Sequence, residues 1–272
     1  MALNIMNSLK PDERERIRQG LGLIKYIQKV IVLAQQHRGM SNTVMQGNES
    51  LKPELMAVQT ALNHLISAKS EPNLKPFPEW KSVVKGWPEL REHSLSGEWQ
   101  VHTLFRQHNI LIARLLTLLD DITRHYELQV IMLDRVTHAL SVCLHTLKVA
   151  ETIAQVRGVG SGICASGVVD DSDKLILDYL RNVVVEASDE LFNELRQIAS
   201  PFLKKQLAMS CQAIRESLNR LLAVIDNQVL NEGETSITAK QFFSTATTPI
   251  DGLLVIFNLI VNMIAEQYAI AV

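Results

Sequence analysis

The sequence predicts an all-α protein with seven or eight long antiparallel helices that form two stacked four-helix bundles. Apolar residues recur at helical spacing through most of the 272 residues, and no stretch shows the alternation typical of a strand. The composition agrees, because aromatic residues make up only 5% of the chain and there are 12 glycines and 8 prolines. Helices of about 40 residues span roughly 60 Å, so we expect the bundles to stack end to end, with two long helices passing between them.

The first part of the chain is predicted to hold two helices and a proline-rich connection. Pro11 suits the first turn of a helix, and apolar residues follow it at helical spacing, which predicts a helix over 11–47. A second helix is predicted over 52–68. The region 71–97 contains four prolines and two tryptophans, which predicts a packed connection with a short helix at 79–85 rather than one long helix.

Four further helices are predicted in the middle of the chain. Two of them cover 97–124 and 127–166. Residues 170–172 would cap a fifth helix that reaches about position 199, and Pro201 would open a sixth that reaches about position 230.

The last predicted helix is the most apolar one. Residues 231–234 predict a turn, and Thr238 then begins a helix that reaches about position 270, with Pro249 as a kink or restart. The longest apolar run covers 253–265, which is shorter than the about 20 residues that cross a bilayer. We therefore expect a buried core helix and no membrane partner.

Charge, cysteines and motifs narrow the classes of function. The net charge of −2 argues against direct nucleic-acid binding through a general basic face. Cys143, Cys164 and Cys211 are odd in number and far apart, and no secretory signal is recognised, so we expect reduced cysteines and a cytoplasmic protein. The eight histidines show no metal-ligand spacing, and no phosphate loop or nucleophile elbow is found. We predict no metal, no cofactor and no enzymatic activity.

One phrase occurs twice, each time late in a long predicted helix. Gln-His-Arg-Gly at 36–39 and Gln-Val-Arg-Gly at 155–158 are each followed by small residues and a further glycine. A glycine inside a helix costs about 1 kcal/mol relative to alanine, so close packing or a ligand should compensate for it. The two arginines offer planar forks of N–H donors that suit an oxyanion, and their like charges would repel when no anion is bound. We expect an anion site formed by Arg38 and Arg157, supported by Gly39, Ser41, Gly158 and Ser161.

Two other interpretations of these arginines stay open. Each could face solvent or form an ion pair with an acidic residue.

Arg215 and Arg220, on the sixth predicted helix, match no repeated phrase; either could reach a central cavity, although a surface position fits them better.

Both phrases resemble the bacterial nitrate- and nitrite-sensing domain family, a helical signalling module. The resemblance lies in VLAQQHRGMSNTVMQG, in VAETIAQVRGVGSGICASG and in FSTATTPIDGLLVIFNLI, and it spans roughly residues 15–268. It implies one domain over 1–272 with two four-helix bundles and with nitrate or nitrite bound between them by Arg38 and Arg157. His37 stands where the family commonly has an acidic residue.

These observations predict a stand-alone sensor of nitrate or nitrite. The family's module normally precedes an output unit, and none is recognised after residue 270, so an unidentified regulatory protein would read the signal. The sequence leaves open whether the chain forms a homodimer. The alternative is a helical scaffold that has lost anion sensing, and a helical enzyme is the weakest candidate.

Overall fold

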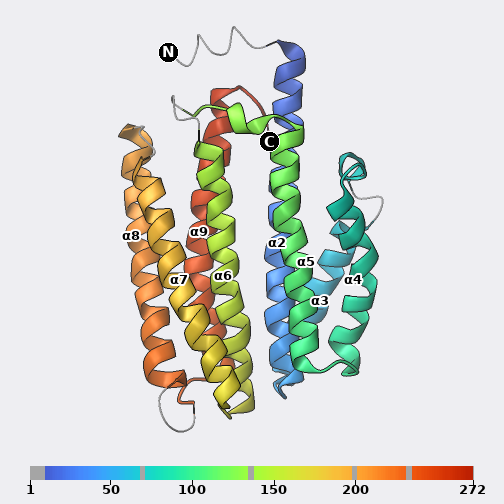
Figure 1. Ribbon diagram of the computed structural model, residues 1–272, viewed down its shortest axis with the longest axis vertical. Helices are drawn as coiled ribbons and strands as arrows, with labels where there is room; N and C mark the ends of the chain where they lie inside the picture. Colours follow the sequence, from blue (N-terminus) through green and yellow to red (C-terminus); the bar gives the residue numbers. More distant parts are fainter. Residues whose placement is uncertain (1–9, 68–70, 134–137, 198–200, 231–234, 272) are drawn as a thin grey trace.

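The computed structural model describes residues 10–67, 71–133, 138–197, 201–230 and 235–271, and this part of the chain is built from eight α-helices without a β-strand (Figure 1). The predicted all-α class is therefore confirmed. The helices are α2 (Pro11–Met45), α3 (Lys52–Leu65), α4 (Pro78–Ser96), α5 (Val101–His125), α6 (Ala139–Ser166), α7 (Asp171–Gln197), α8 (Pro201–Val224) and α9 (Ala239–Gln267).

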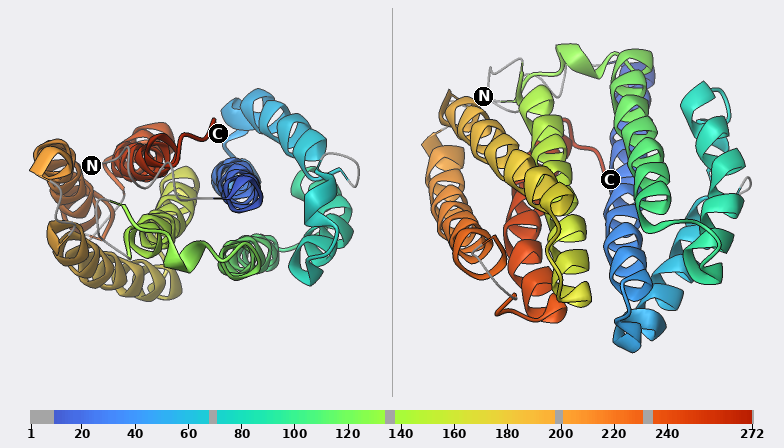
Figure 2. Two further views of the ribbon diagram at one scale, coloured as in Figure 1. Left: turned by 90° about the horizontal axis from the view of Figure 1, so that it is seen from above. Right: turned by 60° about the horizontal axis from the view of Figure 1, so that its bottom comes forward.

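The eight helices form two four-helix bundles that lie side by side. Helices α2 to α5 make one bundle and α6 to α9 make the other, and all run along the long axis of the molecule (Figure 1). The bundles meet mainly through α2 and α6, which are neighbours in the middle of the molecule when it is seen from above (Figure 2). The expected end-to-end stacking is wrong, because these two long helices pack flank to flank and each belongs to one bundle.

The proline-rich region folds differently from the prediction. Instead of a connection with a short helix at 79–85, it forms the 19-residue helix α4, with Pro88 inside it. Trp80 and Trp87 are both buried on the face of α4 that packs against the other helices of the first bundle, as expected from their size. Burial of this apolar face outweighs the backbone hydrogen bond that Pro88 cannot make.

Helix α6 begins later than predicted. Glu127 adopts a left-handed conformation with φ of 50°, and a 3-10 turn follows at Leu128–Val130. A left-handed residue cannot continue an α-helix, so the helix predicted from 127 begins at Ala139.

The starts of α7, α8 and α9 agree with the sequence. The Asp170 carboxylate accepts a hydrogen bond of 2.7 Å from the Asp173 backbone N–H, and Thr238 forms a capping box with Gln241. Helix α8 passes into a π-helical turn at Ile225–Val229, and α9 continues through Pro249. The turn predicted at 231–234 lies outside the described residues.

Helix α9 is the one described helix that is long and apolar enough to cross a membrane by length and composition. Half of its most apolar window is buried inside the protein, where α9 packs against α6 and α8. The buried residues of α9 include Leu253, Phe257 and Ile260, which belong to the hydrophobic core.

Candidate functional site

The two arginines of the repeated phrase lie in the interface between the bundles. Arg38 comes from α2 and Arg157 from α6, and they are 0% and 2% exposed. The Arg157 side chain reaches across the interface, since its Nε lies 3.9 Å from the place that a Cβ atom on Gly39 of α2 would occupy. Neither arginine faces solvent.

Arg38 is paired with a carboxylate of the opposite bundle. Its Nη1 donates to Glu151 Oε1 at 2.6 Å and its Nη2 to Glu151 Oε2 at 3.1 Å, which is a bidentate ion pair. Nη1 also donates to the Asn109 side-chain oxygen of α5 at 2.6 Å. Of the interpretations that the sequence left open, the ion pair with an acidic residue therefore applies to Arg38.

Glu151 is itself buried and fully engaged. Gln35 of α2 donates to its Oε2 at 3.0 Å, and Gln155 of α6 donates to its Oε1 at 2.9 Å. Sequence reasoning missed this residue. Its signal is that Glu151 is the single carboxylate of α6 and stands six residues before Arg157.

Arg157 has a different environment. Its Nη1 donates to the Thr247 hydroxyl at 3.0 Å, and its guanidinium carbon lies 4.5 Å from the centre of the Phe243 ring. Among the described residues, no carboxylate lies within ion-pair distance of it; Glu151 and Asp251 act only from longer range. Burial, and then the positive charge of Arg38, lower the pKa of Arg157 to about 10, so it stays protonated at neutral pH.

The surroundings of the two arginines repeat. The guanidinium carbon of Arg38 lies 5.2 Å from the ring centre of Phe105 on α5, and that of Arg157 lies 4.5 Å from the ring centre of Phe243 on α9. Four residues beyond each phenylalanine comes the side-chain oxygen that accepts from the arginine, on Asn109 and Thr247. Each bundle thus contributes a half-site of arginine, aromatic ring and neutral acceptor.

The two glycines of the phrase allow the half-sites to approach. The Phe105 ring lies 2.6 Å from where a Cβ atom on Gly158 would be, and the Phe243 ring lies 2.9 Å from where one on Gly39 would be. Any side chain at either position would collide with an aromatic ring of the other bundle. The two glycines therefore permit the close packing of the bundles.

Several polar groups in this interface lack a partner among the described residues. They include Nε of both arginines and the hydroxyls of Ser41 and Ser161, which are fully buried. The serines follow the arginines by three and four residues, so each lies on the same side of its helix as its arginine. Buried polar groups are almost always hydrogen-bonded, so this group of donors needs an acceptor.

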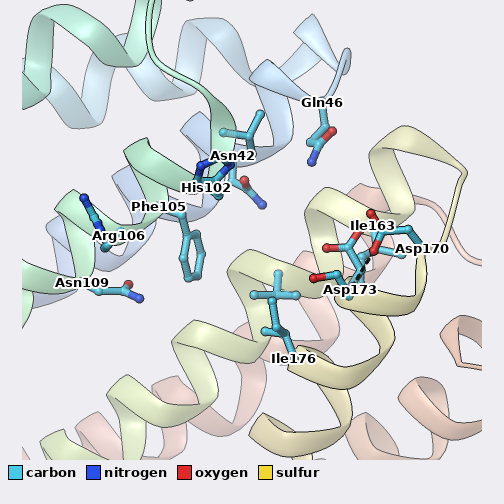
Figure 3. A pocket seen from close by; sticks show the side chains of 13 residues that line it. Asn42, Gln46, His102, Phe105, Arg106, Asn109, Ile163, Asp170, Asp173 and Ile176 are labelled. Atoms are coloured by element: carbon cyan, nitrogen blue, oxygen red, sulfur yellow. Dashed lines mark hydrogen bonds between the residues drawn. The ribbon is translucent and has the colours of Figure 1, made fainter.

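A cleft of about 480 Å³ borders the interface (Figure 3). Arg106 and His102 of α5 lie on one wall, Asp170 and Asp173 lie on the other, and the Phe105 ring projects between them. The lining includes Phe105 and Asn109, which contact Arg38, but neither arginine itself. These two side chains therefore separate Arg38 from the cleft.

A buried histidine pair lies beside Arg38. His37 Nδ1 and His108 Nε2 are 2.7 Å apart, and His108 Nδ1 is 2.9 Å from the Leu104 carbonyl oxygen. Burial lowers the pKa of His37 to about 3 and that of His108 well below its usual value, so both rings are neutral at pH 7. His37 also packs edge-on against Trp87.

The arginines of α8 lie elsewhere. Arg215 stacks over the Phe192 ring of α7 at 4.2 Å and lines a separate cleft between α7 and α8. Arg220 is exposed. Within the described residues, no group of three histidine, cysteine or acidic side chains could hold a metal ion.

The chain is similar in fold to a solved structure described as that of the NasR transcription antiterminator. The TM-score is 0.68 and the sequence identity 18%, and the match covers 95% of this chain and 71% of the other. No protein-family model and no curated protein matches the sequence. At this identity the likeness concerns the fold, so the architecture of two helical bundles is one that a transcriptional regulator also adopts.

Proposed function

We propose that this chain is a cytosolic sensor that binds nitrate or nitrite between its bundles, with Arg38 and Arg157 as the anion-binding residues. The observation that carries the proposal is the environment of Arg157. It is a buried cation without a carboxylate within ion-pair distance among the described residues. A buried charge is costly when it is unpaired, so a bound anion would supply the missing partner.

Charge and hydrogen bonding support a small monovalent oxyanion. The two guanidinium groups and the Glu151 carboxylate leave one positive charge in the interface. A planar oxyanion has several acceptor oxygens for the donors that lack partners, the Nε–H groups of both arginines and the two serine hydroxyls. The resemblance of both arginine phrases to the nitrate- and nitrite-sensing family points to the same ligands.

The position of the site supports a regulatory role. The arginines lie on α2 and α6, the helices through which the bundles meet, so an anion held by both would favour one packing of the bundles over another. We propose that residues 1–272 act as one sensing unit and that a separate regulatory protein reads this change. The likeness to a transcription antiterminator agrees with such a role.

Titration calorimetry with nitrate, nitrite and chloride tests the proposal. The parent protein should bind nitrate or nitrite saturably and chloride weakly, and Arg157→Ala should nearly abolish oxyanion binding while the protein stays folded. Arg215→Ala is a matched control, since Arg215 also stacks on a phenylalanine but faces the α7–α8 side, and it should bind like the parent. A parent protein without saturable heat would support the scaffold interpretation instead.

Arg157 is a cleaner target than Arg38. Removal of Arg38 would leave the Glu151 carboxylate buried without its cation, which typically costs about 3–5 kcal/mol of stability. Arg157→Ala is therefore the variant expected to stay folded, and Arg38→Lys is the milder change at position 38.

A further inference from the structure

Among the residues that the structure describes, Glu151 is the carboxylate that forms an ion pair with an arginine of the interface. It is 6% exposed, both of its oxygens accept hydrogen bonds, and it forms the ion pair that joins α6 to α2. It also acts electrostatically on Arg157, whose pKa it raises against the effect of burial. Its charge is therefore felt by both arginines.

We propose that Glu151 sets the charge selectivity of the anion site, holding the interface at one positive charge so that a monovalent oxyanion neutralises it. This inference rests on the proposed anion-binding function. The ion pair engages Nη1 and Nη2 of Arg38 and leaves its Nε–H free, so Glu151 and an anion can be present together. A divalent oxyanion such as sulfate would leave a net negative charge in a buried interface, which is unfavourable.

Glu151→Gln tests this idea because it removes the charge and keeps the size of the side chain. The variant interface would carry two positive charges. Coulomb attraction scales with the charge of the ligand, so sulfate should gain twice the free energy that nitrate gains. If the affinity for nitrate rises by about tenfold, the affinity for sulfate should rise by about a hundredfold, so the preference for nitrate falls by about tenfold.

Two further variants separate charge from shape. Glu151→Asp keeps the charge and alters the geometry, so it should keep the preference of the parent for nitrate over sulfate. Asp226→Asn is a matched control, because Asp226 also accepts a bidentate pair, from Arg181 Nε and Nη2 at 2.7 Å each, but on the surface of the second bundle. It should change neither affinity.

The experiment is calorimetry with sodium nitrate and sodium sulfate at equal ionic strength on the four proteins, with folding checked by circular dichroism. The inference is overturned if the ratio of the affinities for nitrate and sulfate is the same in Glu151→Gln as in the parent. An equal loss of affinity for both anions is one such result, since Glu151 would then only position Arg38. It is also overturned if Glu151→Asp loses selectivity to the same extent as Glu151→Gln.

The failure of the proposed function looks different. In that case the parent shows no saturable heat with nitrate. The appearance of sulfate binding in Glu151→Gln would then still support the inference, and its absence would overturn both ideas. If Glu151→Gln folds only when an anion is added, sulfate should restore its helicity at a lower concentration than nitrate does. Asp226→Asn should need neither anion to fold.

Discussion

At the scale of single residues, close packing between helices depends on the absence of side chains at certain positions. Gly160 of α6 packs directly against the ring of Phe242 on α9, so a methyl group has no space there. Gly22 of α2 is also helical, but nothing lies within 4 Å of where its Cβ atom would be. The two positions share a backbone conformation and differ in their surroundings.

Alanine substitutions at these two glycines should have opposite effects on stability. Gly160→Ala should lower the free energy of unfolding by about 1–3 kcal/mol, because the added methyl group overpacks the core. Gly22→Ala should raise it by about 0.5–1 kcal/mol, because alanine loses less conformational entropy in a helix than glycine. Urea unfolding measures both, and equal signs for the two variants would contradict the packing described here.

The buried pair His37–His108 should make the protein sensitive to mild acid. The pKa of His37 is about 3 when folded and near 6.5 when unfolded, so between these values the unfolded chain binds more protons. Stability is fully present above pH 6.5 and falls as the pH drops below it. Between pH 7 and pH 5.5 the loss from His37 should be about 1 kcal/mol, and His108, whose pKa is lowered in the same direction by burial, should add to it.

Denaturant titrations at several pH values check this prediction. The double variant His37→Gln/His108→Gln keeps polar side chains but cannot take up protons, and its stability should depend much less on pH in this range. His64→Gln is the control, since His64 is exposed on α3 and its loss should leave the slope unchanged. An unchanged slope in the double variant would assign the acid sensitivity to other groups.

At the scale of single elements, α4 is a helix that forms in spite of a proline in its interior, because its opposite face is buried. Pro88 lies in the interior of this helix on its exposed side, while Trp80 and Trp87 bury the opposite side. Pro78 is the first residue of the same helix and is also exposed. A proline is tolerated at that first position and is unfavourable in the interior.

The two prolines of α4 should therefore respond differently to replacement by alanine. Pro88→Ala should stabilise the protein by about 1–3 kcal/mol relative to Pro78→Ala, because it restores a hydrogen bond within the helix and removes a clash. Both changes raise the conformational entropy of the unfolded chain by a similar amount. The difference between their unfolding free energies therefore reflects the effect of each proline on the folded helix. Thermal unfolding followed by circular dichroism measures it, and equal melting temperatures would contradict the prediction.

At the scale of the whole molecule, the interface between the bundles joins the site to the fold. Arg38 and Glu151 connect α2 to α6, and Arg157 lies beside Gly39 of the opposite bundle. A ligand that binds only this folded arrangement stabilises it against unfolding. Anion binding should therefore be visible in the stability of the entire protein.

Nitrate should raise the melting temperature more than chloride at equal ionic strength. At a hundredfold excess over the dissociation constant, the stabilisation is about 2.7 kcal/mol, which corresponds to roughly 5–10 °C for a chain of this size. Arg157→Ala should lose this difference between the two salts. Equal shifts with both salts in the parent protein would indicate a general salt effect.

The sequence by itself determined the helical class, most helix boundaries and the two arginine phrases. These features depend on local physics: apolar spacing, caps at Asp170 and Thr238, and a repeated string of residues. The failures of prediction also have local causes. Pro88 suggested an interruption that burial of the tryptophans overcame, and the left-handed Glu127 gave no signal in the sequence.

Only the tertiary structure decided what surrounds the arginines. The pairing of Arg38 with Glu151 joins positions 113 residues apart, and the rings that cover Gly39 and Gly158 come from helices distant in sequence. Helical spacing specifies which residues share one face of a helix, but not which face of another helix lies opposite. That choice depends on how the eight helices pack together, which places the bundles side by side and leaves Arg157 buried without a close carboxylate among the described residues.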